Sequence, residues 1–150
     1  MSAKLHLAKP EDLDRLAGLV ARYHEFEGIT QSEEARRAAL APLLEGTPHG
    51  VAYLIGPRTA PVGYIVISFG YSVELGGIDG FVDEFFIREK LRGRGLGGEV
   101  LRTLLPALAG HGVKALHLEV DRENARARSL YGRLGFESRE KYHLMTRVLG

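Results

Sequence analysis

The chain of 150 residues contains no cysteine. That absence excludes a disulfide framework, a zinc site built on thiolates and a cysteine nucleophile, and it favours a reducing compartment. The chain also has no apolar run of the ~18–20 residues that a membrane-spanning helix needs. Its first residues lack the basic and apolar pattern of a secretory signal. We therefore expect a soluble, cytoplasmic protein with no membrane partner.

Two further kinds of site leave no signature in the sequence. The six histidines, at positions 6, 24, 49, 111, 117 and 143, show no paired ligand spacing, so we expect no metal. No Gly-x-Ser-x-Gly elbow is present, which disfavours a serine triad.

The formal net charge of +1 conceals two parts of opposite sign. Residues 1–87 carry seven Lys and Arg against twelve Asp and Glu, whereas residues 88–150 carry thirteen against seven. A polyanionic ligand would favour the second part and a cationic ligand the first. Basic and acidic residues are interleaved and no recognition motif is apparent, so we expect no nucleic-acid partner.

The hydrophobic pattern predicts one domain over residues 1–150, with strands first and then strands alternating with helices. Strands are predicted at residues 5–7, 51–55, 62–69, 81–87 and 115–120, with one or two more within 136–148. Helices are predicted at residues 10–26, 32–46, 96–109 and 124–134, with Pro106 kinking or shortening the third. This order indicates the α/β (α+β) class, a mixed sheet with helices on it.

A glycine-rich loop joins the predicted strand 81–87 to the predicted helix 96–109. It reads Arg92, Gly93, Arg94, Gly95, Leu96, Gly97 and Gly98. Repeated glycines let the backbone approach an anion closely, and the helix start turns free N–H groups toward it. The two arginines add positive charge. The pattern therefore favours a phosphate site over a plain glycine turn.

Two phosphate-binding patterns compete for this loop. Gly93, Gly95 and Gly98 satisfy the dinucleotide pattern G-x-G-x-x-G, and Glu119 lies at roughly the spacing of a ribose contact. However, residues 88–92 separate the strand from the first glycine, and too few strands follow for a doubly wound sheet. A P-loop is excluded because no Gly-Lys-Ser/Thr ending is present.

Residues after the loop distinguish the alternatives. Arg92, Gly95 and Gly97 fit the signature Arg/Gln-x-x-Gly-x-Gly/Ala, and the matching downstream residues are Leu118, Glu119, Val120, Asn124, Ala127, Leu130, Tyr131, Leu134, Gly135 and Phe136. With these residues the chain resembles the GCN5-related N-acetyltransferases (GNAT family). The resemblance implies the GNAT fold, a mixed, mostly antiparallel sheet of six to seven strands with about four helices and parallel, splayed central strands.

The resemblance also implies roles for named residues, with acetyl-CoA as the co-substrate. Backbone groups of Phe85, Phe86 and Ile87 would pair with the pantetheine like an added strand. The amides of residues 93–98 would hold the pyrophosphate, and Asn124 would contact the cofactor. Tyr131 would protonate the leaving thiolate, although its helical spacing with Leu130 and Leu134 also suits a plain core tyrosine.

Acyl transfer to an amine needs a group that takes up the ammonium proton. Asp83, Glu84 and Glu119 are the candidates, and a water chain is a further alternative. Alternation in a strand predicts that Asp83 and Glu84 point to opposite faces. In family members acting on protein N-termini, a glutamate at the Glu119 position is the base. In the spermidine/spermine acetyltransferase-like branch, the first member of the acidic pair is implicated.

The region from Val62 to Ile87 resembles that spermidine/spermine (diamine) branch. Acidic residues near the first two predicted helices suit a cationic acceptor, and Tyr23 and His24 are placed to line its entrance. We expect direct acetyl transfer to a primary amine of a small cationic or amino-acid-like molecule by a homodimer. The alternatives are a protein N-terminal or lysine acetyltransferase and a non-catalytic acyl-CoA sensor.

Overall fold

The computed structural model describes residues 4–150, which divide into two compact units on either side of the step from Glu119 to Val120. The first unit holds the sheet and three α-helices, and the second holds one α-helix and the C-terminal segment. The prediction of a single domain over residues 1–150 stays a prediction. No described helix is long and apolar enough to cross a membrane.

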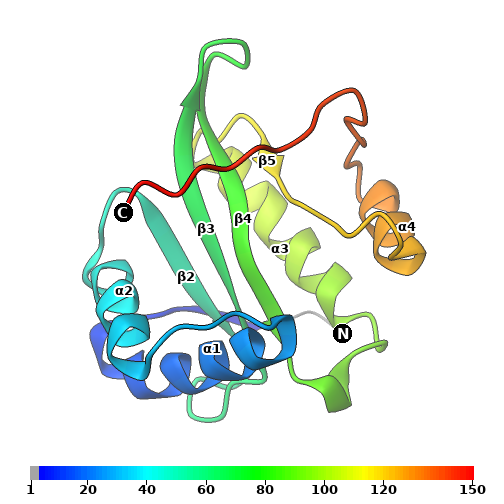
Figure 1. Ribbon diagram of the computed structural model, residues 1–150. Helices are drawn as coiled ribbons and strands as arrows, with labels where there is room; N and C mark the ends of the chain where they lie inside the picture. Colours follow the sequence, from blue (N-terminus) through cyan, green and yellow to red (C-terminus); the bar gives the residue numbers. More distant parts are fainter. Residues whose placement is uncertain (1–3) are drawn as a thin grey trace. The chain divides into compact units, whose positions relative to one another are not determined.

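A five-stranded sheet forms the first unit, with its strands side by side in chain order (Figure 1). The first three pairs are antiparallel, and the last pair is parallel. The strands are β1 (Leu5–Leu7), β2 (Gly50–Ile55), β3 (Gly63–Ser72), β4 (Gly77–Ile87) and β5 (Leu116–His117). β3 and β4 extend past the predicted residues 62–69 and 81–87 into one long hairpin.

Four α-helices accompany the sheet, near the positions that the sequence predicts. They are α1 (Leu13–Glu27, after a 3-10 turn at Pro10–Asp12), α2 (Glu33–Glu45), α3 (Leu96–Gly110) and, in the second unit, α4 (Ala125–Arg133). The Ser32 hydroxyl caps α2 by accepting the Ala35 N–H at 3.0 Å, as its residue type favours. Pro106 does not shorten α3, which continues to Gly110.

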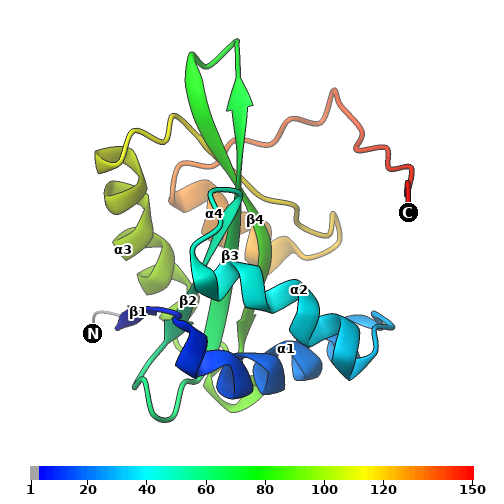
Figure 2. The same ribbon diagram turned by 90° about the vertical axis from the view of Figure 1, so that its left-hand side faces the viewer.

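Helices cover both faces of the sheet in the first unit. Figures 1 and 2 show α1 and α2 on one face and α3 on the other. Apolar side chains of α1 and α2 pack with inward residues of β2, β3 and β4, among them Leu16, Val20, Leu54, Tyr64, Val66 and Phe86. α3 buries Val100, Leu101, Leu104 and Leu108 at helical spacing. This two-sided core holds the ends of β4 and α3 in place.

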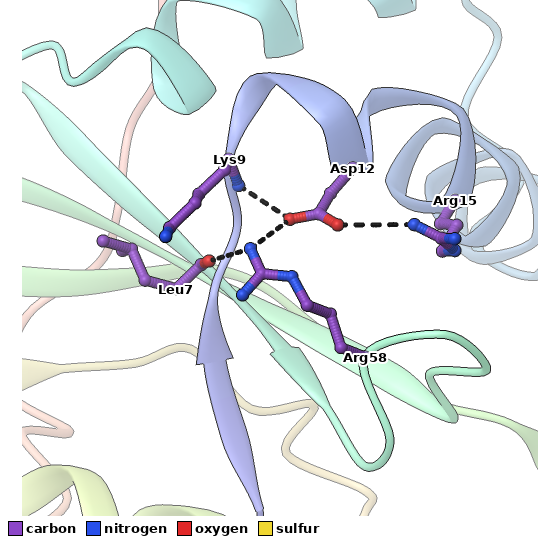
Figure 3. A network of polar contacts seen from close by, with 5 residues as sticks. All are labelled: Leu7, Lys9, Asp12, Arg15 and Arg58. Atoms are coloured by element: carbon purple, nitrogen blue, oxygen red, sulfur yellow. Dashed lines mark hydrogen bonds and ion pairs between the residues drawn. The ribbon is translucent and has the colours of Figure 1, made fainter.

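A buried carboxylate ties the start of α1 to the sheet (Figure 3). Asp12 is 0% exposed and accepts the Lys9 backbone N–H at 2.9 Å and the Arg58 guanidinium at 2.8 Å. Arg58 also donates to the carbonyl oxygen of Leu7 in β1, at 3.2 Å. Burial acts to raise the pKa of the Asp12 carboxyl, but the hydrogen bonds and the two nearby arginines outweigh it and lower that pKa.

The described residues contain five strands instead of the expected six to seven. The segment 136–150, where one or two strands were expected, forms no strand, because its backbone finds no ladder partner in the described chain. The strand expected at 115–120 is reduced to Leu116–His117, which pair only with Gly80 and Phe81 of β4. β4 and β5 are parallel as expected, but β5 is the edge strand of the described sheet and not a central one.

Candidate active site

An irregularity in β4 lies at the acidic pair. Ile67 pairs with Val82 and the preceding Val66 pairs with Glu84, so Asp83 is an extra residue in the ladder. Such a bulge bends the strand and redirects its side chains, and bulges are frequent beside active sites. Simple alternation is interrupted at this bulge, so the expectation that Asp83 and Glu84 point to opposite faces stays a prediction.

Glu84 is held by two aromatic side chains from different elements. The Tyr64 hydroxyl of β3 donates to Glu84 Oε1 at 2.7 Å. On the other oxygen, Oε2 lies 2.8 Å from His24 Nε2 of α1. Tyr64 is 0% exposed and His24 is 6% exposed. Both oxygens of this carboxylate are thus engaged by buried groups that the core keeps in place.

The proton positions in this network follow from its partners. Burial, and then the Glu84 carboxylate, raise the pKa of the Tyr64 hydroxyl, so Tyr64 stays a donor. His24 Nδ1 is buried and has no hydrogen-bond partner in residues 4–150. A carboxylate oxygen can only accept, so the 2.8 Å contact places a proton on His24 Nε2. Glu84 is therefore a fixed hydrogen-bond acceptor.

Asp83 differs from its neighbour in both exposure and partners. It lies at the surface of the first unit, whereas Glu84 is partly buried. Partial loss of water around its carboxyl, and then the Glu84 charge beside it, raise the pKa of Asp83, while His24 lowers it. Two adjacent carboxylates in unlike environments divide proton chemistry between them in many active sites.

The end of β4 leads directly toward the glycine loop. Beyond Phe81, no described strand pairs with the edge of β4 that faces away from β3. Its last residues, including Phe85, Phe86 and Ile87, therefore offer an unpaired backbone edge on that side. A Cβ placed on Gly97, in the first turn of α3, would lie 3.8 Å from Ile87 Cδ1 and 3.9 Å from Phe85 Cζ. The strand end and the helix start therefore lie close together.

The loop takes the backbone conformation that its glycines permit. Gly93 and Gly95 both have φ of 80°, in the left-handed region that other residues rarely adopt. Gly95 is the N-cap of α3 and supplies no side-chain hydrogen bond to the first turn. The first turn of α3, which includes Leu96, Gly97 and Gly98, therefore has no capping side chain on its N–H groups.

The two arginines of the loop have different surroundings. Arg92 Nε donates to the carbonyl oxygen of Ile87 at 2.7 Å, and its guanidinium carbon lies 4.5 Å from the centre of the Phe26 ring. Arg94 is exposed. The side chain of Arg92 therefore contacts β4 and α1, whereas that of Arg94 is exposed to solvent.

The remaining predicted residues lie at and beyond the boundary between the units. Glu119 ends the first unit, two residues after β5, and is exposed. In the second unit, Asn124 Oδ1 caps α4 by accepting the Ala127 N–H at 3.0 Å. The ring of Tyr131 packs edge-on against Phe136 at 5.9 Å, and burial raises the pKa of its hydroxyl.

The structure thus brings together the acidic pair, the strand end and the glycine loop in one unit. Sequence reasoning did not assign Tyr64 to the site, because an aromatic residue in an apolar strand is typical of a core. No group of three or more His, Asp or Glu residues in the described chain could hold a metal ion.

Comparison with known proteins identifies the family. Residues 14–136 match the model of the acetyltransferase (GNAT) family, and the chain belongs to that family. The Bacillus subtilis (strain 168) uncharacterized N-acetyltransferase YobR is 35% identical over 68 residues. That match spans 44% of this chain and only 28% of YobR.

Solved structures extend the likeness to nearly the whole chain. The integron cassette protein HFX_CASS3, from the mobile metagenome of Cole Harbour Salt Marsh, is 34% identical with a TM-score of 0.83. That alignment covers 97% of this chain and 90% of the other. A predicted acetyltransferase from Clostridium acetobutylicum, solved with acetyl-CoA, shares the fold at 15% identity, a TM-score of 0.76 and 96% coverage of both chains.

Proposed function

We propose that this protein is an acetyl-CoA-dependent N-acetyltransferase that transfers acetyl directly to a primary amine of a small cationic or amino-acid-like acceptor. The observation that carries the proposal is the unpaired edge of β4, which runs into a glycine loop at the start of α3. An extended amide chain ending in a pyrophosphate, as in coenzyme A, matches that arrangement.

Donor binding would use backbone groups of the first unit. The pantetheine amides would add to the edge at Phe85, Phe86 and Ile87, and the pyrophosphate would lie on the amides of residues 93–98. The exposed guanidinium of Arg94 would add charge attraction. The fold neighbour from Clostridium acetobutylicum was solved with acetyl-CoA, which supports the same co-substrate here.

Proton uptake is assigned to Asp83. The amine nitrogen attacks the thioester carbonyl carbon, so the ammonium must first lose a proton. Asp83 is exposed, at a bulge, and has a raised pKa, which makes it the better proton acceptor of the pair. Glu84 already accepts hydrogen bonds on both oxygens and would act as a fixed charge.

The other proton belongs to the leaving group. When the carbon–sulfur bond breaks, the coenzyme A thiolate would take the proton of the Tyr131 hydroxyl. The raised pKa of that hydroxyl keeps it protonated until the thiolate forms. Asn124 would contact the cofactor through its amide N–H groups, since its oxygen is engaged in capping α4.

The acceptor is the least constrained part of the proposal. The acidic surplus of residues 1–87 and the resemblance to the spermidine/spermine branch favour a cationic amine. We also propose a cytoplasmic location and a homodimeric state. A protein N-terminus or lysine is the alternative acceptor, and acyl-CoA sensing without turnover is the alternative function.

A coenzyme A release assay with a panel of amines tests the proposal. The panel should hold polyamines, amino acids and peptide N-termini, each with acetyl-CoA at several concentrations. Turnover on a small cationic amine is the expected result. Binding of acetyl-CoA with no turnover on any amine would favour the sensor, and failure to bind acetyl-CoA would remove the proposed function.

A further inference from the structure

The side chain of Arg92 is directed at the protein by three separate contacts. Its Nε–H donates to the last carbonyl oxygen of β4, at Ile87, over 2.7 Å. Its guanidinium carbon lies 4.5 Å from the centre of the Phe26 ring and 5.2 Å from that of Phe86. All three lie within the range of strong hydrogen bonds and cation–π contacts. Arg92 therefore joins the glycine loop to two other elements.

The two rings have different surroundings. Phe86 is 6% exposed and packs against Tyr23 and Tyr64, with ring centres 6.0 and 6.2 Å away. Phe26 is 64% exposed, in the last turn of α1. Phe86 thus anchors the guanidinium to the core, and Phe26 covers it from the surface.

We propose that Arg92 is a positioning residue, and that with Phe26 it holds the glycine loop in the register that binds the donor. This inference rests on the proposed function, because it concerns the acetyl-CoA site. The residues immediately after Arg92 are those whose amides would meet the pyrophosphate, and Gly93 and Gly95 give the backbone freedom there. A loop with that freedom needs a fixed point at its start, and Arg92 supplies one.

The geometry requires arginine and not merely positive charge. A planar guanidinium can donate from Nε while its face lies against aromatic rings, whereas an ammonium is a compact point charge. Lysine at this position would keep the charge, but it could not donate to Ile87 while a planar group lies against both rings. Charge and positioning can therefore be separated by substitution.

Calorimetric binding of acetyl-CoA to the full chain tests the inference. We expect Arg92→Lys to weaken binding about tenfold, a loss in the range of these contacts, with an unchanged salt dependence. Phe26→Leu removes no charge, and it should weaken binding in the same direction by a smaller factor. The double variant should lose less than the product of the two factors, because both substitutions break one contact.

Two comparisons complete the design. Arg94→Ala should weaken binding mainly at low salt, as expected for a solvent-exposed charge near phosphates. Arg139→Lys is the matched control, since Arg139 also stacks on a ring, that of Tyr142 at 4.9 Å, outside the proposed site. In turnover assays, Arg92→Lys should raise KM for acetyl-CoA while changing kcat by less than about threefold.

The outcomes distinguish this inference from the proposed function. Wild-type affinity in both Arg92→Lys and Phe26→Leu would overturn the positioning role while leaving the donor site intact. Loss of binding in Arg92→Lys with none in Phe26→Leu would also overturn it. If the wild-type chain does not bind acetyl-CoA, the proposed function itself fails. Thermal unfolding of each variant shows whether a loss of binding reflects global destabilisation. Phe26 is exposed, so we expect Phe26→Leu to fold even if Arg92→Lys does not.

Discussion

The two units of the described chain differ sharply in what stabilises them. Every buried apolar residue, from Ala8 to Leu108, belongs to the first unit. The second unit has one helix of nine residues with none of them buried. Its C-terminal segment exposes large apolar side chains, including Met145 and Leu149 at 90% each.

This difference separates the two halves of the proposed chemistry. The end of β4, which we propose binds the donor, and the acidic pair belong to a sheet covered by helices on both faces. Asn124 and Tyr131 rest on local contacts, a helix cap to Ala127 and an edge-on ring contact with Phe136. We therefore expect substitutions in the first unit to affect stability and chemistry, and those in the second to affect chemistry alone.

The largest expected effect concerns Asp83. Asp83→Asn should lower turnover on the order of 10²–10⁴-fold, the range for loss of a general base. Because Asp83 must lose its proton to act and its pKa is raised, wild-type activity should rise with pH through that pKa. Glu84→Gln removes the neighbouring charge, so the acidic limb of its pH–rate profile should move to lower pH.

This pair of variants identifies the base. A loss of turnover in Glu84→Gln as large as in Asp83→Asn, with no shift of the limb, would assign the role to Glu84. Glu119→Gln is the third variant. A loss of turnover in this variant alone would assign the role of base to Glu119. The pH profiles of kcat for the three variants separate these outcomes.

In the second unit, Tyr131→Phe should lower turnover about 100-fold, because the thiolate would leave without its proton donor. Affinity for acetyl-CoA should change little, since the substitution removes one hydroxyl. Single-turnover kinetics and calorimetry measure the two quantities. Tyr142→Phe, at an exposed tyrosine of the same unit, is the control. Equal rates for wild type and Tyr131→Phe would refute the acid role.

Asp12 tests stability in the first unit. Asp12→Asn should lower the free energy of unfolding by about 1–3 kcal/mol at pH 7, because it removes the buried charge that accepts the hydrogen bonds of Lys9 and Arg58. The folded-state pKa lies below the ordinary value of 3.8, so this stabilisation is present above pH 3.8 and is lost as pH falls through the folded-state pKa.

Urea unfolding at pH 7 and at about pH 3 measures this change. The difference between wild type and Asp12→Asn should shrink at the lower pH. The exposed Asp14, which pairs with Arg37 at the surface, is the matched control, and Asp14→Asn should stay close to wild type at both pH values. A constant difference across pH would show that the Asp12 charge is not what stabilises the fold.

Two glycines of the loop give a matched pair with a smaller effect. Gly95→Ala should cost about 1–2 kcal/mol, because its φ of 80° is unfavourable for alanine although nothing lies within 4 Å of the added carbon. Gly97→Ala meets only ordinary contacts beyond 3.4 Å and should be tolerated. Thermal unfolding compares them, and an equal cost at both positions would contradict the backbone explanation.

The smallest effect is expected at the C-terminal segment. Met145→Ser should change the free energy of unfolding by less than about 0.5 kcal/mol, since the side chain is already exposed. Urea unfolding at several protein concentrations measures it. A loss above about 2 kcal/mol, growing with concentration, would instead indicate that this segment is buried against a second copy.

Much of the first unit could be predicted from local patterns. The proline and acids before α1, the Ser32 cap of α2 and the periodic leucines of α3 act through neighbouring residues, and each helix lies where they predict. The glycine loop is equally local. The strand predicted at 115–120 was too long, because alternation shows that a segment is apolar without showing how far a partner strand accompanies it.

The features that the sequence determined by itself are those that depend on residues close together in the chain. The order of strands and helices, the glycine loop and the family motif around Asn124 and Tyr131 are of this kind. Only the tertiary structure decided the relation of Asp83 to Glu84, because a bulge depends on the register against β3. It also decided that His24 and Tyr64 hold Glu84, and that Arg92 turns back toward Phe26 and Phe86. These contacts join residues up to 66 positions apart in the chain, and no local pattern encodes them.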